Sequence, residues 1–122
     1  MMISGGFGRT GTKVEVEVIS PSSNVSCSVP DLPQPRSGHT MNSNTVCGGG
    51  GTDTQTSCDQ LTNAGWTRSH NLKYRREGHS SWEVEDGIIL LGGANSGTTS
   101  EIAKWDGTTE ELFNMQYNTQ YL

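Results

Sequence analysis

The stretch TVCGGGG, residues 45–51, carries two apolar residues directly before a run of four glycines. A glycine pair that follows apolar residues occurs twice more, in MISGGFG at 2–8 and in ILLGGAN at 89–95. The leading glycines lie 43 and 44 positions apart (48 − 5 and 92 − 48). Such a fixed spacing is typical of repeat proteins, in which each repeat is one supersecondary unit. The three glycine pairs are Gly5-Gly6, Gly48-Gly49 and Gly92-Gly93.

A second motif recurs between the glycine pairs. PRSGHT at 35–40 and RREGHS at 75–80 share the pattern Arg-x-Gly-His-Ser/Thr, at an offset of 40 (76 − 36). Its residues are Arg36, Gly38 and His39 in one copy and Arg76, Gly78 and His79 in the other. Because these histidines recur at equivalent positions, packing or hydrogen bonding is favoured over a catalytic or metal-binding role.

The remaining histidine, His70, lies outside the motif and is expected at the surface. The three histidines and three cysteines show none of the spacings that are typical of zinc sites. The sequence therefore predicts no metal site.

The segments around these motifs read as short strands. In KVEVEVIS, residues 13–20, valines alternate with glutamates, so the two residue types point to opposite faces of a strand. Four such strands follow one another in each repeat, with glycine-rich turns between them, and no segment has a convincing amphipathic helical period. The pattern predicts an all-β protein.

The charge and the lengths of the apolar runs indicate which kinds of partner the chain is not expected to bind. Charged residues make up 17% of the chain and the net charge is −5, with no basic run beyond Lys73, Arg75 and Arg76. Since nucleic-acid binding needs a cationic face, no nucleic-acid partner is expected. The longest apolar run, residues 88–91, is far too short for a membrane span.

The glycine run at 48–51 invites comparison with a phosphate-binding loop. Such loops need a lysine or a Gly-x-Gly-x-x-Gly pattern ahead of a helix. GGGGTDTQTSC, residues 48–58, has no lysine and no helical period follows it. The glycines are therefore interpreted as turn residues that permit positive φ, and no cofactor is predicted.

With these motifs combined, the chain resembles the kelch repeat family. The family's marks are a diglycine after an apolar strand, an arginine followed by small residues that opens the next repeat, and a tryptophan on the fourth strand. They appear here as the three diglycines, as Arg36 and Arg76, and as Trp66. The resemblance implies a kelch-type β-propeller fragment of about three blades, each of four antiparallel strands.

The repeat frame divides the chain into a partial first blade at about 2–35, a second at 36–73 and a third at 76–116. Residues 117–122 are expected to open a further repeat. Since propellers close with about four to eight blades, the remaining blades are expected outside this chain. Closure by association of several copies is the alternative.

In this frame Cys47 ends one strand and Cys58 lies on the next, within one antiparallel hairpin. Directly opposed residues of such a hairpin lie within disulfide range, so a Cys47–Cys58 bond is predicted, with buried free thiols as the alternative. Cys27 replaces the fourth-strand tryptophan of the first copy. It is expected to be either a small core residue or the partner of a cysteine outside the chain.

Asn24 begins the glycosylation sequon Asn-Val-Ser in a predicted turn. Together with the predicted disulfide, the sequon favours an extracellular or secreted protein over a cytoplasmic one.

The resemblance implies a non-catalytic module that binds a protein partner through its inter-strand loops. These loops are expected at about 7–13, 20–25, 50–56, 62–65 and 94–100. The alternative is part of a kelch-type copper oxidase, with its site in missing blades. That chemistry would need converging Tyr and His ligands, and Tyr74, Tyr117 and Tyr121 form no such motif with histidine.

Overall fold

The computed structural model describes residues 2–20, 22, 25–51, 56–94, 99–106 and 108–119. These residues form antiparallel β-strands, bridges and turns, and they contain no helix. The prediction of an all-β protein is therefore confirmed. Nothing in these ranges forms a helix that could cross a membrane.

The N-terminal part forms a three-stranded sheet in the order β1-β4-β5 and a separate two-stranded hairpin. The sheet consists of β1 (Met2–Ser4), β4 (Val16–Ser20) and β5 (Val25–Ser28). The hairpin consists of β2 (Phe7–Gly8) and β3 (Gly11–Thr12). The segment at 7–13, expected as a loop, is thus an ordered hairpin between two strands of the first sheet.

Two four-stranded sheets follow, each with its strands in sequence order. The second sheet consists of β6 (Thr40–Asn42), β7 (Thr45–Cys47), β8 (Ser57–Thr62) and β9 (Gly65–Asn71). The third sheet consists of β10 (Ser80–Val84), β11 (Gly87–Leu91), β12 (Thr99–Trp105) and β13 (Glu110–Thr119).

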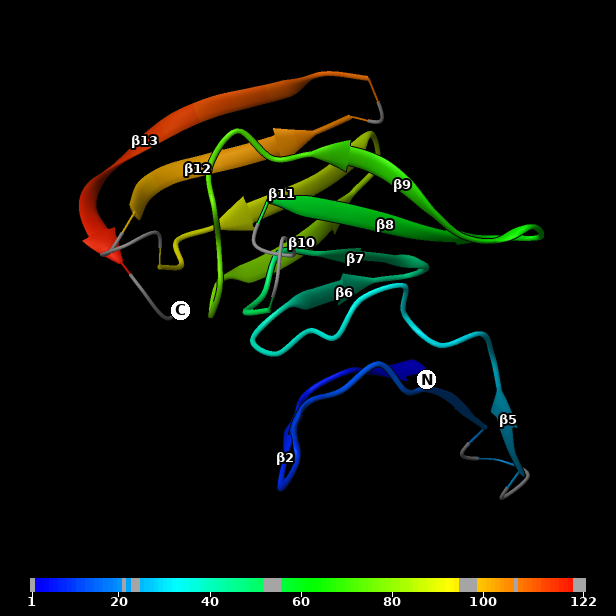
Figure 1. Ribbon diagram of the computed structural model, residues 1–122. Coiled ribbons are helices and arrows are strands. Elements are labelled where there is room, and N and C mark those ends of the chain that lie inside the picture. The colour runs from blue at the N-terminus through cyan, green and yellow to red at the C-terminus, as the bar shows by residue number, and fades with distance from the viewer. Residues whose placement is uncertain are drawn as a thin grey trace.

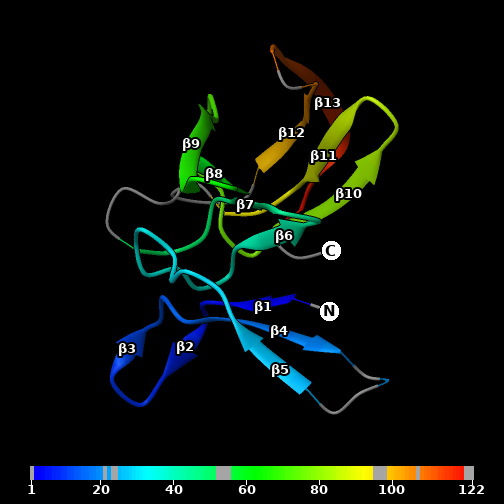
Figure 2. The same cartoon turned by 90° about the vertical axis from the view of Figure 1, so that its right-hand side faces the viewer.

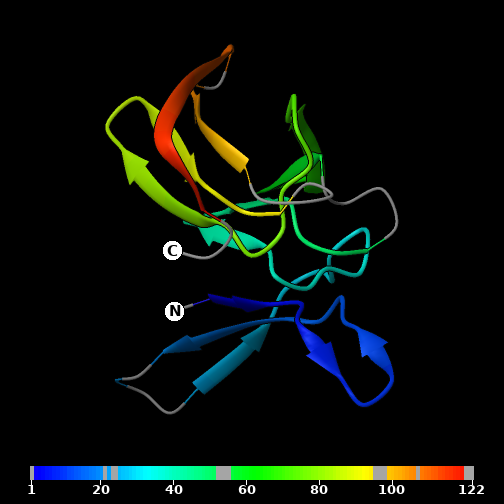
Figure 3. The ribbon, with the colours of Figure 1, turned by 90° about the vertical axis from the view of Figure 1, so that its left-hand side faces the viewer.

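The three sheets follow one another in space as they do along the chain (Figures 1 and 2). The first strands of the second and third sheets, β6 and β10, contact each other. Their last strands, β9 and β13, stand apart, so the two sheets splay outward from β6 and β10 (Figure 2). The β2–β3 hairpin stands clear of both four-stranded sheets (Figure 3).

Successive side chains of β7 point to opposite faces of the second sheet. The core therefore has two clusters, one on each face. Val46 faces the first sheet, where it packs with Val16 and Leu32. Its neighbour Cys47 faces the third sheet. The cluster on that side consists of Cys47, Cys58, Leu72, Leu90 and Ala103. Each sheet is therefore buried against the next one along the chain, as expected when a single repeat cannot cover its own apolar face.

The predicted disulfide is present. Cys47 and Cys58 are directly opposed on β7 and β8, with their Cα atoms 4.2 Å apart, and their sulfurs are bonded. Both side chains are buried. The bond closes the glycine-rich connection between these strands, whose middle residues 52–55 lie outside the described ranges.

Loss of this bond is expected to destabilise the fold. In the double variant C47A/C58A, the free energy of unfolding should fall by about 2–3 kcal/mol, because the bond restricts a short loop in the unfolded chain. Urea denaturation without reductant measures the change. Cys27→Ala is the control, since it replaces a cysteine and leaves the Cys47–Cys58 bond intact. Equal losses in the two variants would contradict a stabilising disulfide.

The C-terminal boundary of the third sheet differs from the expected one. β13 runs from Glu110 to Thr119, past the boundary placed at residue 116. Residues 117–119 lie within this strand, where Thr119 pairs with Thr99, and residues 120–122 lie outside the described ranges. The repeat boundaries were placed from the glycine pairs, which mark where strands turn. The glycine pairs do not indicate how far the last strand continues.

Candidate functional site

Arg36, the first residue of the repeated motif, lies fully buried at the edge of the second sheet. Its Nη1 donates to the carbonyl oxygens of Gly48, at 2.8 Å, and Ser57, at 2.9 Å. Its Nη2 donates to Ser57 Oγ at 2.7 Å and to a carboxylate oxygen of Asp59. The other oxygen of Asp59 accepts from Arg68 Nε at 2.7 Å. One guanidinium thus ties together the ends of β7 and β8.

Arg76 takes the equivalent place in the third sheet, where its Nη1 donates to the carbonyl oxygen of Gly92 at 2.7 Å. The backbone at both arginines also joins one sheet to the preceding one. Gly6 N–H donates to Arg36 O and Gly49 N–H donates to Arg76 O, each at 2.7 Å. The glycine pairs and the arginines therefore form a repeated joint between successive sheets.

The motif histidines lie within the same joints. His39 Nε2 shares a hydrogen bond with Ser4 Oγ at 2.9 Å, and His79 Nε2 shares one with Thr40 Oγ1 at 2.8 Å. Burial lowers the pKa of His79 to about 4, and the positive charge of Arg76 acts in the same direction. The imidazole is therefore neutral near pH 7. This geometry agrees with the expected hydrogen-bonding role.

The motif glycines connect the second and third sheets directly. Gly38 and Gly78 adopt φ of +62° and +61°, in the left-handed region that glycine enters without a steric cost. In this conformation Gly78 N–H donates to Gly38 O at 2.8 Å. Trp66 on β9 connects the other pair of sheets, because its Nε1 donates to Pro30 O at 2.7 Å.

The sequence predicted that His70 lies at the surface, but its side chain is partly buried against the third sheet. Its ring stacks on that of Trp105 in the third sheet, with centroids 3.6 Å apart and planes 17° from parallel. Burial lowers the pKa of His70 to about 4, so the ring is neutral near pH 7. The surface prediction for His70 was wrong because its aromatic neighbour, Trp105, lies on another sheet and 35 residues away in the sequence (105 − 70).

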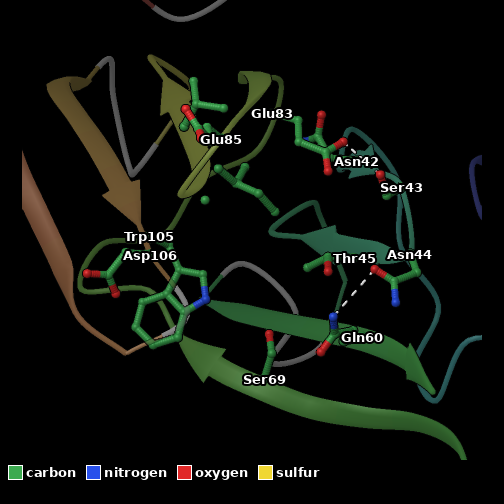
Figure 4. A pocket seen from close by; sticks show the side chains of 13 residues that line it. Asn42, Ser43, Asn44, Thr45, Gln60, Ser69, Glu83, Glu85, Trp105 and Asp106 are labelled. Atoms are coloured by element: carbon green, nitrogen blue, oxygen red, sulfur yellow. Dashed lines mark hydrogen bonds between the residues drawn. The ribbon is translucent and has the colours of Figure 1, made fainter.

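An open cleft of about 370 Å³ lies between the second and third sheets, near the β6–β7 and β10–β11 turns (Figure 4). We call it the inter-sheet cleft. Its second-sheet side includes Asn42, Ser43, Asn44, Thr45, Gln60 and Ser69. Its third-sheet side includes Glu83, Val84, Glu85, Ile88, Trp105 and Asp106. The lining is therefore polar and acidic, with one large aromatic ring.

This cleft had no signature in the sequence. Its lining comes from turns and strands that are separated by up to 64 residues (106 − 42), without a local motif. Glu85 and Asp86 are exposed at the β10–β11 turn. Glu83 and Glu85 nevertheless line the cleft.

Four residues named from the sequence are described in part or not at all, and Tyr121 is one that lies outside the described residues. Asn24 is outside the described residues, and Cys27 is described by its backbone alone, within β5. The same holds for Tyr117 on β13. Across the described ranges, no group of three or more His, Cys, Asp or Glu side chains is placed to hold a metal ion.

The fold and joints define an all-β protein of successive antiparallel sheets that are linked by repeated arginine–glycine contacts. No family model matches the chain, and no curated protein matches it. The chain is similar to the solved structure of YjhT, with a TM-score of 0.75 and 17% sequence identity over 98% of this chain. It spans 50% of the length of YjhT. At this identity the similarity concerns the fold alone.

Proposed function

We propose that this chain is part of a kelch-type β-propeller and acts as a non-catalytic module that binds another protein. The propeller arrangement is supported by the repeated joint. Both Arg36 and Arg76 accept a glycine N–H from the preceding sheet, at the same 2.7 Å. If the same contact joins each sheet to the next, successive sheets are related by a similar rotation. Blades of a propeller are arranged in this way around a central axis.

The outer face of the third sheet supports the presence of further blades. Trp82 is 69% exposed and Phe113 is 50% exposed, on the face opposite to buried Leu90. The register places Ile89, Leu91 and Ile102 on the same face. Contiguous exposed apolar surface of this kind marks an interface. In a propeller the next blade would cover it, whether it belongs to the same polypeptide or to a second copy.

The observation that carries protein binding is the β2–β3 hairpin. Phe7 is 79% exposed, the highest value among the large apolar side chains of the described residues. The neighbouring Arg9 is exposed as well, and Lys13 Nζ donates to Thr10 Oγ1 at 2.7 Å across the turn. An ordered hairpin that presents an aromatic ring beside a cation has the composition of an interface hot spot.

The Cys47–Cys58 bond supports a proposed location for the protein, because disulfides persist in oxidising compartments. We therefore place the proposed binding module outside the cytoplasm, in an extracellular or secreted setting.

Replacement of Phe7 tests this function. A protein partner that is isolated with the chain from extracellular fluid and then purified should bind Phe7→Ser about tenfold or more weakly than the wild type, because aromatic anchors dominate interface energetics. Titration by surface plasmon resonance measures the affinity.

Phe113→Ser is the matched control, since it removes the same side chain from the face assigned to the next blade. It should leave the affinity for the partner unchanged. Unaltered binding by Phe7→Ser would contradict recognition through the hairpin. Stoichiometric copper in the full-length protein would contradict the non-catalytic assignment and favour the oxidase.

A further inference from the structure

The inter-sheet cleft has the size of a ligand site. Its volume of about 370 Å³ falls at the lower end of the range for small-molecule pockets, roughly 300–1,000 Å³. Trp105 and Asp106 lie at one end of the cleft, and Asn44 and Gln60 lie at the other (Figure 4). One side chain with a flat, polar end would fit this space.

The amide groups of the lining already donate to the protein. Asn42 Nδ2 donates to Ser81 Oγ at 2.5 Å, and Asn44 Nδ2 donates to Leu61 O at 2.9 Å. Gln60 Nε2 donates to Asn44 Oδ1 at 3.4 Å. Each of these bonds uses one N–H of an amide group, and each group keeps a second N–H. The amide oxygens of Asn42 and Gln60 can act as acceptors for a ligand. The cleft therefore offers amide acceptors beside its carboxylates.

Thr45 also lines the cleft, as a buried residue of β7. Its hydroxyl can both donate and accept a hydrogen bond, so it adds polar capacity to this wall of the cleft.

The charged residues that line the cleft all have one sign. Glu83, Glu85 and Asp106 line it, and none of the lining residues is Lys, Arg or His. Hydrogen bonds from the backbone N–H groups of Thr109 and Thr108 lower the pKa of Asp106 and keep it ionised. An anionic ligand would be repelled from this lining, and a cation would be attracted.

Trp105 provides a flat surface of fixed orientation. His70 covers one face of the indole at 3.6 Å and holds the ring in place, while the ring also lines the cleft. Cations bind favourably over tryptophan, and a planar guanidinium can also stack on it. An aromatic surface beside carboxylates suits such a group better than a compact ammonium.

We propose that the inter-sheet cleft receives the guanidinium group of an arginine side chain from a partner polypeptide, an inference that rests on the protein-binding role proposed above. A guanidinium is planar and positively charged, and it carries five N–H donors and no acceptor. It therefore matches the amide acceptors, the carboxylates and the indole together. Charge also distinguishes it from a neutral saccharide, which the carboxylates would not attract.

The test uses N-acetyl-arginine-N-methylamide and its citrulline counterpart, which has nearly the same shape and no charge. Binding to the whole chain is followed through the indole N–H resonance of Trp105. The arginine compound should shift this resonance, and citrulline should bind about tenfold or more weakly, because hydrogen bonds to charged groups are the stronger ones. Added salt should weaken the binding of arginine.

The variant E83Q/E85Q removes two charges and keeps the side-chain shape, so arginine should bind it several-fold more weakly. Glu17→Gln, at an exposed position on β4 in the first sheet, is the control and should bind as the wild type does. Equal affinity for citrulline and arginine, or tighter binding of a methyl glycoside, would overturn the inference. If arginine fails while partner binding still depends on Phe7, the cleft inference falls and the proposed function stands.

Discussion

Replacement of Arg36 by methionine is expected to lower the free energy of unfolding by about 3–5 kcal/mol, the range for breaking a buried ion pair. Arg36 is fully buried and its guanidinium donates to Gly48, Ser57 and Asp59. Methionine fills a similar volume but leaves these acceptors without their donor. Urea denaturation measures the loss.

Arg68→Met is the matched control, because Arg68 binds the same carboxylate from a position that is 44% exposed. Exposed ion pairs contribute little, so this variant should lose less than about 1 kcal/mol. A double variant, R36M/D59L, should regain part of the stability, since an apolar pair can replace a buried ion pair. Equal losses for Arg36→Met and Arg68→Met would contradict the central role of Arg36.

The substitution Gly48→Ala is expected to cost about 2–5 kcal/mol. Gly48 adopts φ of +64°, which costs a residue with a side chain about 1–2 kcal/mol. A Cβ at this position would lie 2.5 Å from Arg76 O and 2.8 Å from His79 Cε1, so the joint with the third sheet would have to open. Overpacking of this kind costs a further 1–3 kcal/mol or so.

Gly11→Ala separates these two contributions. Gly11 adopts φ of +106°, and a Cβ there would meet no atom within 4 Å. The control therefore carries the backbone cost without the crowding, and it should be the milder substitution. Thermal melts of both variants measure the difference. If Gly11→Ala is as destabilising as Gly48→Ala, crowding against Arg76 is not what makes Gly48 necessary.

Much of the fold could be predicted because its turns impose local backbone requirements. Gly48 and Gly78 need a left-handed backbone, which few other residues tolerate, and this need leaves a visible repeat in the sequence. The disulfide was predictable for a related reason. Cys47 and Cys58 belong to one hairpin and are only 11 residues apart, so their pairing follows from the turn between them.

The inter-sheet cleft and the stacking of His70 on Trp105 depend on packing between sheets. Gln60 and Glu83 come to line one space because the second sheet packs on the third, and neither residue belongs to a repeated motif. The sequence by itself determined the strand-and-turn pattern, the positions of the repeated motifs and the disulfide, since these follow from short-range geometry. The tertiary structure alone decided the joints and the cleft, because their residues are brought together by the packing of one sheet on the next, which no local pattern records.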